Sequence, residues 1–176
     1  MNITLKPLQS EDVALFEKWL RQDYIFKWFC MEGEDDKADI DAEVEMAGWM
    51  EQIHGRHTTH QHVKHFIVYL DGVKVGFCLY FDMIDEAEYL RDFYPDLVDD
   101  LVENHTYEIG YLIGEKSLLG KGIGKIIIQK LEEMVREIGG KTIIADPNEK
   151  NIPSVKVVLA NGFTKFKDND YRKKLN

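Results

Sequence analysis

A strand, a glycine-rich loop and a long helix follow one another between residues 106 and 140, and this unit limits what the chain can fold into. The strand reads TYEIGYLI, and the loop and the first part of the helix read SLLGKGIGKIIIQKL. Glycines let a backbone approach a ligand closely, and the free N–H groups at the start of a helix favour an anion. The unit therefore predicts an α/β protein with an anion-binding loop, while a tight glycine turn without a ligand stays open as the alternative.

The spacing of the loop glycines separates this loop from two common phosphate-binding motifs. A Walker loop needs a serine or threonine after its lysine, whereas Lys121 is followed by Gly122. A dinucleotide fingerprint has the order G-x-G-x-x-G near the start of a strand–helix–strand unit, whereas Gly120, Gly122 and Gly124 alternate singly and late in the chain. Because Lys121 and Lys125 add positive charge, an anion remains the expected ligand.

The rest of the pattern predicts a mixed sheet with flanking helices. Ser10 is the expected N-cap of the first helix, Asp71-Gly72 is typical of a hairpin turn, and Pro153 suits a first helical turn. The expected order is strand 3–8, helix 10–22, helix 39–53, hairpin 65–81, a helical stretch 86–103 broken at Pro95, strand 106–113, the glycine loop and its helix, strand 141–146, a short helix after Pro153, and a terminal hairpin within 162–175.

Length and charge narrow the class of protein. The 176 residues suit one domain, and no apolar run is long enough to cross a bilayer. The first residues show no signal-peptide core, and Cys30 and Cys78 are too far apart for a metal-type pair, so we expect a cytoplasmic protein with reduced thiols. The net charge of −10 argues against nucleic acid and fits a cationic ligand.

Two stretches carry a resemblance to a known superfamily. The segment YEIGYLIGEKSLLGKGIGKIIIQKL, followed by IIADPNEKNIPSVKVVLANGF, resembles the core of the GCN5-related N-acetyltransferases. Leu119 to Gly124 match the loop signature of that superfamily except at its first place, and Asn151, Ser154 and Gly162-Phe163 match its later motif. The opening LKPLQSEDVALFEKWLRQDYIFKWF and Asp146-Pro147 are similar to the aminoglycoside 6'-N-acetyltransferases.

The resemblance implies an α/β acyl-CoA N-acyltransferase fold over 1–176. Its sheet is mixed and mostly antiparallel, with a splayed central strand pair and a bulge in the strand TYEIGYLI. Acetyl-CoA would lie in the splay as the cosubstrate, with its pantetheine arm against the main chain of Tyr111 and Ile113 and the far end of that arm facing Asn151 and Ser154. Its pyrophosphate would bind the loop, at Leu119, Gly120, Lys121, Gly122, Ile123, Gly124 and Lys125.

The resemblance also implies direct attack of an amine on the thioester. An ammonium must first lose a proton, so a carboxylate base is needed, and Glu108 is our choice. Asp146 matches an aspartate of the relatives. Two structural alternatives stay open, a solvated strand residue for Glu108 and a strand-ending turn for Asp146. The usual general-acid tyrosine is replaced by Val158, so either Tyr111 supplies the proton, or the thiolate leaves unassisted, or activity is low.

The acceptor is expected to be a small cationic amine, with an aminoglycoside as the leading candidate. Carboxylates beside an aromatic ring suit such a cation, although acidic surface is common in any protein. Another amine, a protein N-terminus, or a coenzyme A-binding module without turnover remain alternatives, and monomer and homodimer both remain open. The histidines at 54–65 are read as a polar loop, so no metal site is expected. The candidate acceptor residues are Trp28, Glu32, Asp35, Asp36, Asp99 and Asp100.

Overall fold

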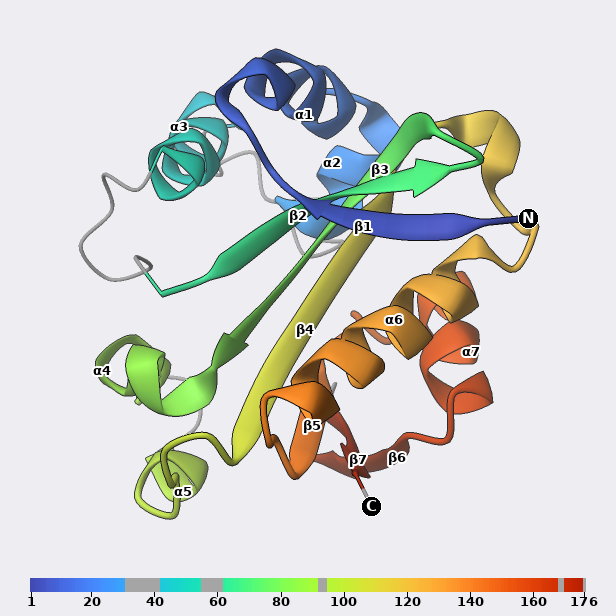
Figure 1. Cartoon of the computed structure of the whole chain (residues 1–176). Helices are drawn as coiled ribbons and strands as arrows, with labels where there is room; N and C mark the ends of the chain where they lie inside the picture. The colour runs from blue at the N-terminus through green and yellow to red at the C-terminus, as the bar shows by residue number, and fades with distance from the viewer. Residues whose placement is uncertain (31–41, 55–61, 92–94, 168–169, 176) are drawn as a thin grey trace.

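The computed structural model describes residues 1–30, 42–54, 62–91, 95–167 and 170–175. They form one seven-stranded sheet in the order β1-β2-β3-β4-β5-β7-β6, in which only β4 and β5 are parallel neighbours (Figure 1). No described helix is long and apolar enough to span a membrane. The strands are β1 (Ile3–Pro7), β2 (Lys64–Leu70), β3 (Val73–Asp82), β4 (Thr106–Ile113), β5 (Thr142–Ala145), β6 (Thr164–Lys167) and β7 (Asp170–Lys174).

Helices cover both faces of this sheet. The helices α1 to α3 lie together on one side of the long strands, and α6 and α7 lie on the other (Figure 1). Alternate residues of each strand face the two helical layers, because successive side chains of a strand point to opposite faces. The helices are α1 (Val13–Leu20), α2 (Asp23–Phe29), α3 (Ala42–Ile53), α4 (Ala87–Leu90), α5 (Pro95–Val98), α6 (Ile123–Glu137) and α7 (Ile152–Ala160).

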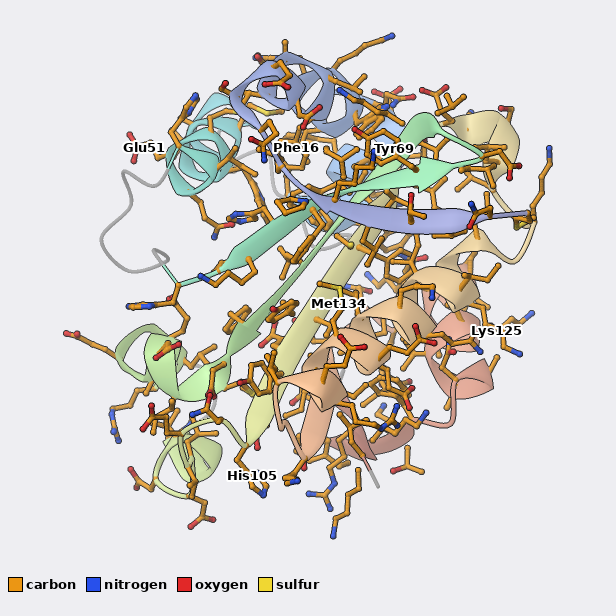
Figure 2. All side chains as sticks on the ribbon, viewed as in Figure 1. Phe16, Glu51, Tyr69, His105, Lys125 and Met134 are labelled. Carbon is orange, nitrogen blue, oxygen red and sulfur yellow. The ribbon has the colours of Figure 1, made fainter. Side chains whose placement is uncertain are left out.

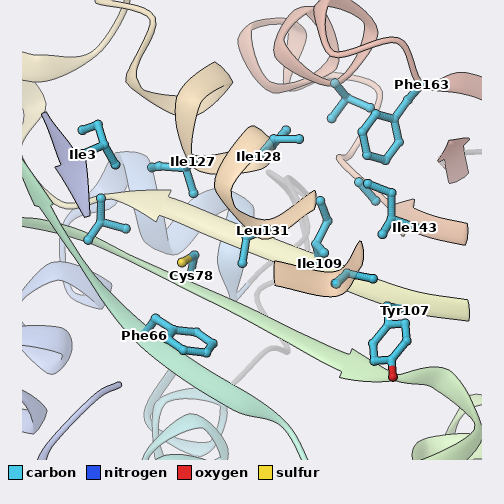
Figure 3. Close-up of a cluster of buried hydrophobic side chains, with 14 of the residues drawn as sticks. Ile3, Phe66, Cys78, Tyr107, Ile109, Ile127, Ile128, Leu131, Ile143 and Phe163 are labelled. Atoms are coloured by element: carbon cyan, nitrogen blue, oxygen red, sulfur yellow. The ribbon is translucent and has the colours of Figure 1, made fainter. Parts of the chain in front are cut away.

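The larger core lies beneath α6 and is called the α6 cluster here. Ile127, Ile128 and Leu131 are fully buried and pack over Ile109 of β4 and Ile143 of β5 (Figure 3). Their spacing of one, three and four residues along the helix turns one apolar stripe toward the sheet. This packing holds the first turn of α6, and therefore the glycine loop before it, against the end of β4.

The second core, called the α1 cluster, fills the opposite face. Phe16, Trp19 and Leu20 are fully buried there, and the Phe16 ring lies 4.4 Å from the Phe77 ring of β3. A Cβ on Gly114, just after β4, would come within 2.2 Å of the Trp19 ring, so glycine is needed for this close approach.

A third cluster, called the α4 cluster, occupies the other end of that same face. It contains Met83 from the 3₁₀ turn Met83–Glu86, Leu90 of α4, Val98 of α5 and Ile144 of β5. Phe81 of β3 packs against both the α1 and the α4 cluster, so the sheet face on which Phe81 lies is flanked by helices at both ends.

The expected order of elements is confirmed, with three local corrections. Ser10 is not an N-cap: it begins the 3₁₀ turn Ser10–Asp12, which Gln9 caps. The first helical region continues as a separate helix, α2. The α-helices among the described residues of 86–103 are the short α4 and α5, and Pro95 begins α5, in agreement with the break expected at Pro95. The terminal hairpin and the helix with Pro153 in its first turn are as expected. The bulge in β4 is not present in its pairing with β3, whose register is continuous from Gly76↔Ile113 to Asp82↔Tyr107.

Candidate functional site

The parallel strands β4 and β5 separate halfway along β4. They pair only at Thr106↔Thr142, Tyr107↔Ile143 and Glu108↔Ile144, after which β5 ends at Ala145 and β4 continues to Ile113. In Figure 1, β4 continues past the end of β5 toward the loop before α6. The splay therefore arises from the shortness of β5, and the last part of β4 has a strand on one side only.

The main-chain groups that point into this open edge follow from the pairing with β3. Gly114 N–H donates to Val75 O at 2.8 Å, so in an antiparallel ladder every second residue of β4 from Gly114 backwards bonds to β3. The residues between them, Tyr111 and Ile113, direct their N–H and C=O groups to the open edge. These are the two residues for which the resemblance implies contact with pantetheine.

The glycine loop presents a run of N–H groups at the start of α6. Gly120 and Gly122 have φ angles of +73° and +78°, and Gly122 is the N-cap of α6. Among the described residues, none accepts a hydrogen bond from the N–H groups of residues 120–125, whereas the N–H of Leu119, which was also expected at the pyrophosphate, donates to Lys116 O at 3.2 Å. Lys125 extends outward from the first turn of α6 (Figure 2). Six N–H groups and the positive end of the helix dipole can thus hold a pyrophosphate.

Tyr111 links the open edge to both helices of the α6 cluster. A Cβ on Gly124 would lie 2.9 Å from the Tyr111 hydroxyl, so only glycine leaves room for it. The hydroxyl is also close enough to the Ser154 side chain for a hydrogen bond. Burial raises the pKa of Tyr111, and the Ser154 contact partly opposes this rise. Asn151 caps α7, because its side chain accepts from Ser154 N–H at 3.4 Å.

Three carboxylates meet on the other face of β4, and they are called the carboxylate cluster here. Burial raises the pKa of Glu108 well above its ordinary value, and the charges of Asp146 and Asp170 raise it further. Its Oε2 atom is buried and has no hydrogen-bond partner among the described residues, although part of the side chain is exposed. Such an atom is costly to bury unless a ligand donates to it.

Strand register explains why these three carboxylates meet. Glu108 is next to Ile144 on β5, and Asp146 follows two residues later on the same face. Ala145 pairs with Tyr171, so extending that register sets Asp146 opposite Asp170 at the start of β7. The sequence reasoning missed Asp170, which is buried at 5% exposure. Its only signal is the pairing of the terminal hairpin with β5, which a single sequence does not reveal.

The predicted acceptor residues are only partly described by the structure. Glu32, Asp35 and Asp36 lie outside the described residues. Asp99 is exposed and forms an ion pair with Arg91 at 2.8 Å, and Asp100 is exposed beside it. Trp28 is half-buried, with the Lys27 ammonium 5.0 Å from its ring centroid. Among the described residues, the ion pair of Asp99 leads to Arg91 and the cation contact of Trp28 leads to Lys27, and neither leads to the carboxylate cluster.

The histidine run is likewise only partly described. His57 and His60 lie outside the described residues, while His65 contacts the Gln52 side chain at 3.0 Å and stacks on Phe77. Within the described ranges, no group of three His, Cys, Asp or Glu side chains has a geometry that could hold a metal ion. The same result applies to the carboxylate cluster, whose three members lie within those ranges.

The fold is similar to that of several solved structures, which include acetyltransferases. A crystal structure of aminoglycoside acetyltransferase AAC(6')-Ib in complex with coenzyme A matches with a TM-score of 0.74 at 17% identity, over 98% of this chain and 95% of that one. A domain from Methanocaldococcus jannaschii matches at 0.68 and 24% identity, over 99% of each chain. An aminoglycoside N(6')acetyltransferase from Legionella pneumophila matches at 0.64 and 16% identity, over 99% of this chain and 93% of that one. At such identities these likenesses establish the fold alone.

The sequence comparisons go further. No curated protein sequence matched the chain. The family model of the acetyltransferase (GNAT) domain matches residues 2–164, which include the open edge, the loop and two members of the carboxylate cluster, Glu108 and Asp146. The chain therefore belongs to the GNAT family of N-acetyltransferases, which take the acetyl group from acetyl-CoA.

Proposed function

We propose that this enzyme acetylates a primary amine of a small cationic acceptor, and that the carboxylate cluster receives that amine. The observation that carries the proposal is Glu108 itself: a buried carboxyl oxygen without a described partner, beside Asp146 and Asp170, at the point where β4 and β5 separate. A protonated amine would supply both the missing donor and the compensating charge.

The donor side of the molecule suits acetyl-CoA. The N–H groups of residues 120–125 would hold the pyrophosphate, and the open edge at Tyr111 and Ile113 would pair with the amides of the pantetheine arm. Bound in this way, acetyl-CoA would have its thioester at the end of the open edge, near Glu108. Ser154 contacts the Tyr111 side chain, and Asn151 holds the first turn of α7 in place.

Glu108 would accept the proton that the amine must lose. An ordinary carboxylate is a weak base toward an ammonium, because the pKa of a carboxyl group lies far below that of an ammonium. Burial and the charges of Asp146 and Asp170 raise the pKa of Glu108, which narrows the gap between the two pKa values. The amine nitrogen then attacks the carbonyl carbon, the C–N bond forms and the C–S bond breaks. Asp146 and Asp170 would hold the cationic acceptor by Coulomb attraction.

Tyr111 would donate to the departing sulfur. The family position for this role is Val158, which is 1% exposed within the α6 cluster and has no proton to give. Ser154 lies one helical turn before Val158, and the Tyr111 hydroxyl reaches that turn from the sheet. A phenol whose pKa is raised by burial keeps its proton at neutral pH, so it can donate to a developing thiolate.

Several cationic groups on one acceptor fit the cluster better than one. Three carboxylates within mutual electrostatic reach favour a polyamine-like molecule, and an aminoglycoside is the leading candidate. Crystal structures of similar folds hold kanamycin, at 17% identity, and ribostamycin, at 18% identity. The exposed Asp99 and Asp100 and the half-buried Trp28 would extend the attraction outside the cluster.

A thiol-release assay across aminoglycosides, polyamines and peptides tests this proposal. We expect turnover with multiply charged amines and little with neutral peptides. If the enzyme preferred a peptide N-terminus, a peptide would replace the small cationic amine as the proposed acceptor. Tight acetyl-CoA binding without turnover of any amine would instead indicate a coenzyme A-binding module.

A further inference from the structure

Three side chains from α1 and the start of α2 converge on the place where β4 ends and the loop begins. Tyr24 donates from its hydroxyl to both Ile113 O and Gly114 O, each at 3.0 Å. Gln22 Nε2 donates to Gly114 O at 2.8 Å, and Trp19 Nε1 donates to Glu115 Oε1 at 3.3 Å. These residues lie 89 to 96 positions from their partners in the sequence, so only the tertiary fold brings them together.

The Tyr24 bond fixes one peptide plane at both ends. The plane between Ile113 and Gly114 contains the Ile113 carbonyl and the Gly114 N–H. That N–H donates to Val75 O on β3 at 2.8 Å, while the carbonyl on the opposite side accepts from Tyr24. The Tyr24 hydroxyl therefore lies at the open edge of β4, where it occupies one of the edge's acceptors.

We infer that Tyr24 is a positioning residue for the acetyl donor. This inference rests on the proposed function, in which the pantetheine arm pairs with the open edge. Because Tyr24 occupies the Ile113 carbonyl, the edge offers the donor both main-chain groups of Tyr111 and only the N–H of Ile113. The arm of the donor then has one register on β4, set by a hydroxyl from α2.

The inference assigns different roles to the two neighbouring side chains. Gln22 holds only the Gly114 carbonyl, which Tyr24 also contacts, so its loss leaves the Ile113 plane fixed. Loss of the Tyr24 hydroxyl frees the Ile113 carbonyl, which already points to the open edge, as an additional acceptor there, so the arm of the donor gains an alternative register. Tyr24→Phe should therefore affect donor binding more than Gln22→Met.

The test is binding of two probes to the full chain, measured by calorimetry. Acetyl-CoA contacts both the open edge and the loop, whereas ADP carries a diphosphate but no pantetheine arm. We expect Tyr24→Phe to weaken acetyl-CoA binding by about three- to tenfold, the usual worth of one hydrogen bond, and to leave ADP binding unchanged. Tyr69→Phe is the matched control, since Tyr69 packs against the same α1 cluster and its hydroxyl bonds to no described residue.

The outcomes separate this inference from the proposed function. Unchanged acetyl-CoA affinity in folded Tyr24→Phe would overturn the inference while leaving the enzyme assignment in place. Equal loss for acetyl-CoA and ADP would also overturn it, because the loop would then have been disturbed. A wild-type chain that binds acetyl-CoA but turns over no amine would end the proposed acceptor function, and the two-probe comparison would still decide the role of Tyr24.

Discussion

Glu108 and Tyr111 lie on the same strand, and their side chains point to opposite faces of the sheet. Glu108 belongs to the carboxylate cluster, while Tyr111 packs against the α6 cluster beside Gly124. The main chain between them begins the open edge of β4. The proposed proton acceptor for the amine and the proposed proton donor for the sulfur would therefore approach one thioester from two sides without competing for the same space.

The loop is tested by Gly122→Val. Gly122 has a φ of +78°, so a β-branched residue strains the turn and moves the N–H groups proposed to hold the pyrophosphate. We expect acetyl-CoA affinity to fall at least about tenfold, or 1.4 kcal/mol, by calorimetry. The control is Gly139→Val, which has a similar φ of +95° at the far end of α6 and open space around it. Equal affinity losses in the two variants would remove the loop from the site.

Glu108→Gln keeps the size of the side chain and removes the carboxylate proposed as the base. We expect turnover to fall on the order of 10²-fold, with acetyl-CoA affinity unchanged. In the wild type, the rate should rise with pH as Glu108 ionises, and this limb should lie above the ordinary carboxyl range because burial raises that pKa. The limb should vanish in the variant but persist in Glu133→Gln, an exposed glutamate paired with Lys130. Full turnover in Glu108→Gln across the pH series would place the base elsewhere.

Asp146→Asn should shift the rise of the rate with pH, rather than abolish it. The negative charge of Asp146 raises the pKa of Glu108, so its removal lets Glu108 ionise at lower pH. The rise in rate should then shift toward acid, and the KM of a cationic acceptor should increase. Steady-state rates between acid and neutral pH measure both effects. A limb at the wild-type position would show that the two carboxylates act independently.

Tyr111→Phe tests the proton donor. The ring that packs against Gly124 is retained, so acetyl-CoA affinity should change little, while turnover should fall at least about tenfold through loss of a hydrogen bond to a developing charge. The pKa of the thiol of bound coenzyme A, followed by ultraviolet absorbance of the thiolate, should rise for the same reason.

Tyr80→Phe is the control for Tyr111→Phe. Tyr80 is half-buried against the same α6 cluster, and its hydroxyl bonds to no described residue. It should leave both the rate and the thiol pKa unchanged. A thiol pKa that is the same in wild type and Tyr111→Phe would mean that the sulfur leaves without help from this residue.

The exposed acids are tested by salt and by charge. The screening length shrinks from about 10 Å at 0.1 M to about 3 Å at 1 M, so the KM of a polyamine should rise with ionic strength more than that of acetyl-CoA. Asp99→Asn combined with Asp100→Asn should raise the KM of a multiply charged amine more than that of a singly charged one. Because Asp99 already pairs with Arg91, most of the effect should come from Asp100. Equal changes in KM for the two amines would show that Asp99 and Asp100 are solvated surface residues that do not bind the acceptor.

The sequence by itself determined the parts of this protein that depend on neighbouring residues. The glycine loop, the helix after it and the Asp71-Gly72 hairpin follow from local backbone preferences and apolar spacing, and their motifs also carry the family. Glu108 and Asp146 could be named as candidates through the resemblance to the family, which those motifs carry.

Only the tertiary structure decided which distant side chains act together. Asp170 joins Glu108 and Asp146 because β7 pairs with β5, and Tyr24 reaches Ile113 because α2 packs beside the end of β4. Strand register and helix docking are set by the burial of whole faces, to which residues from all parts of the chain contribute. No short motif encodes such a pairing, so these contacts could be identified only after the sheet and its two helical layers were assembled.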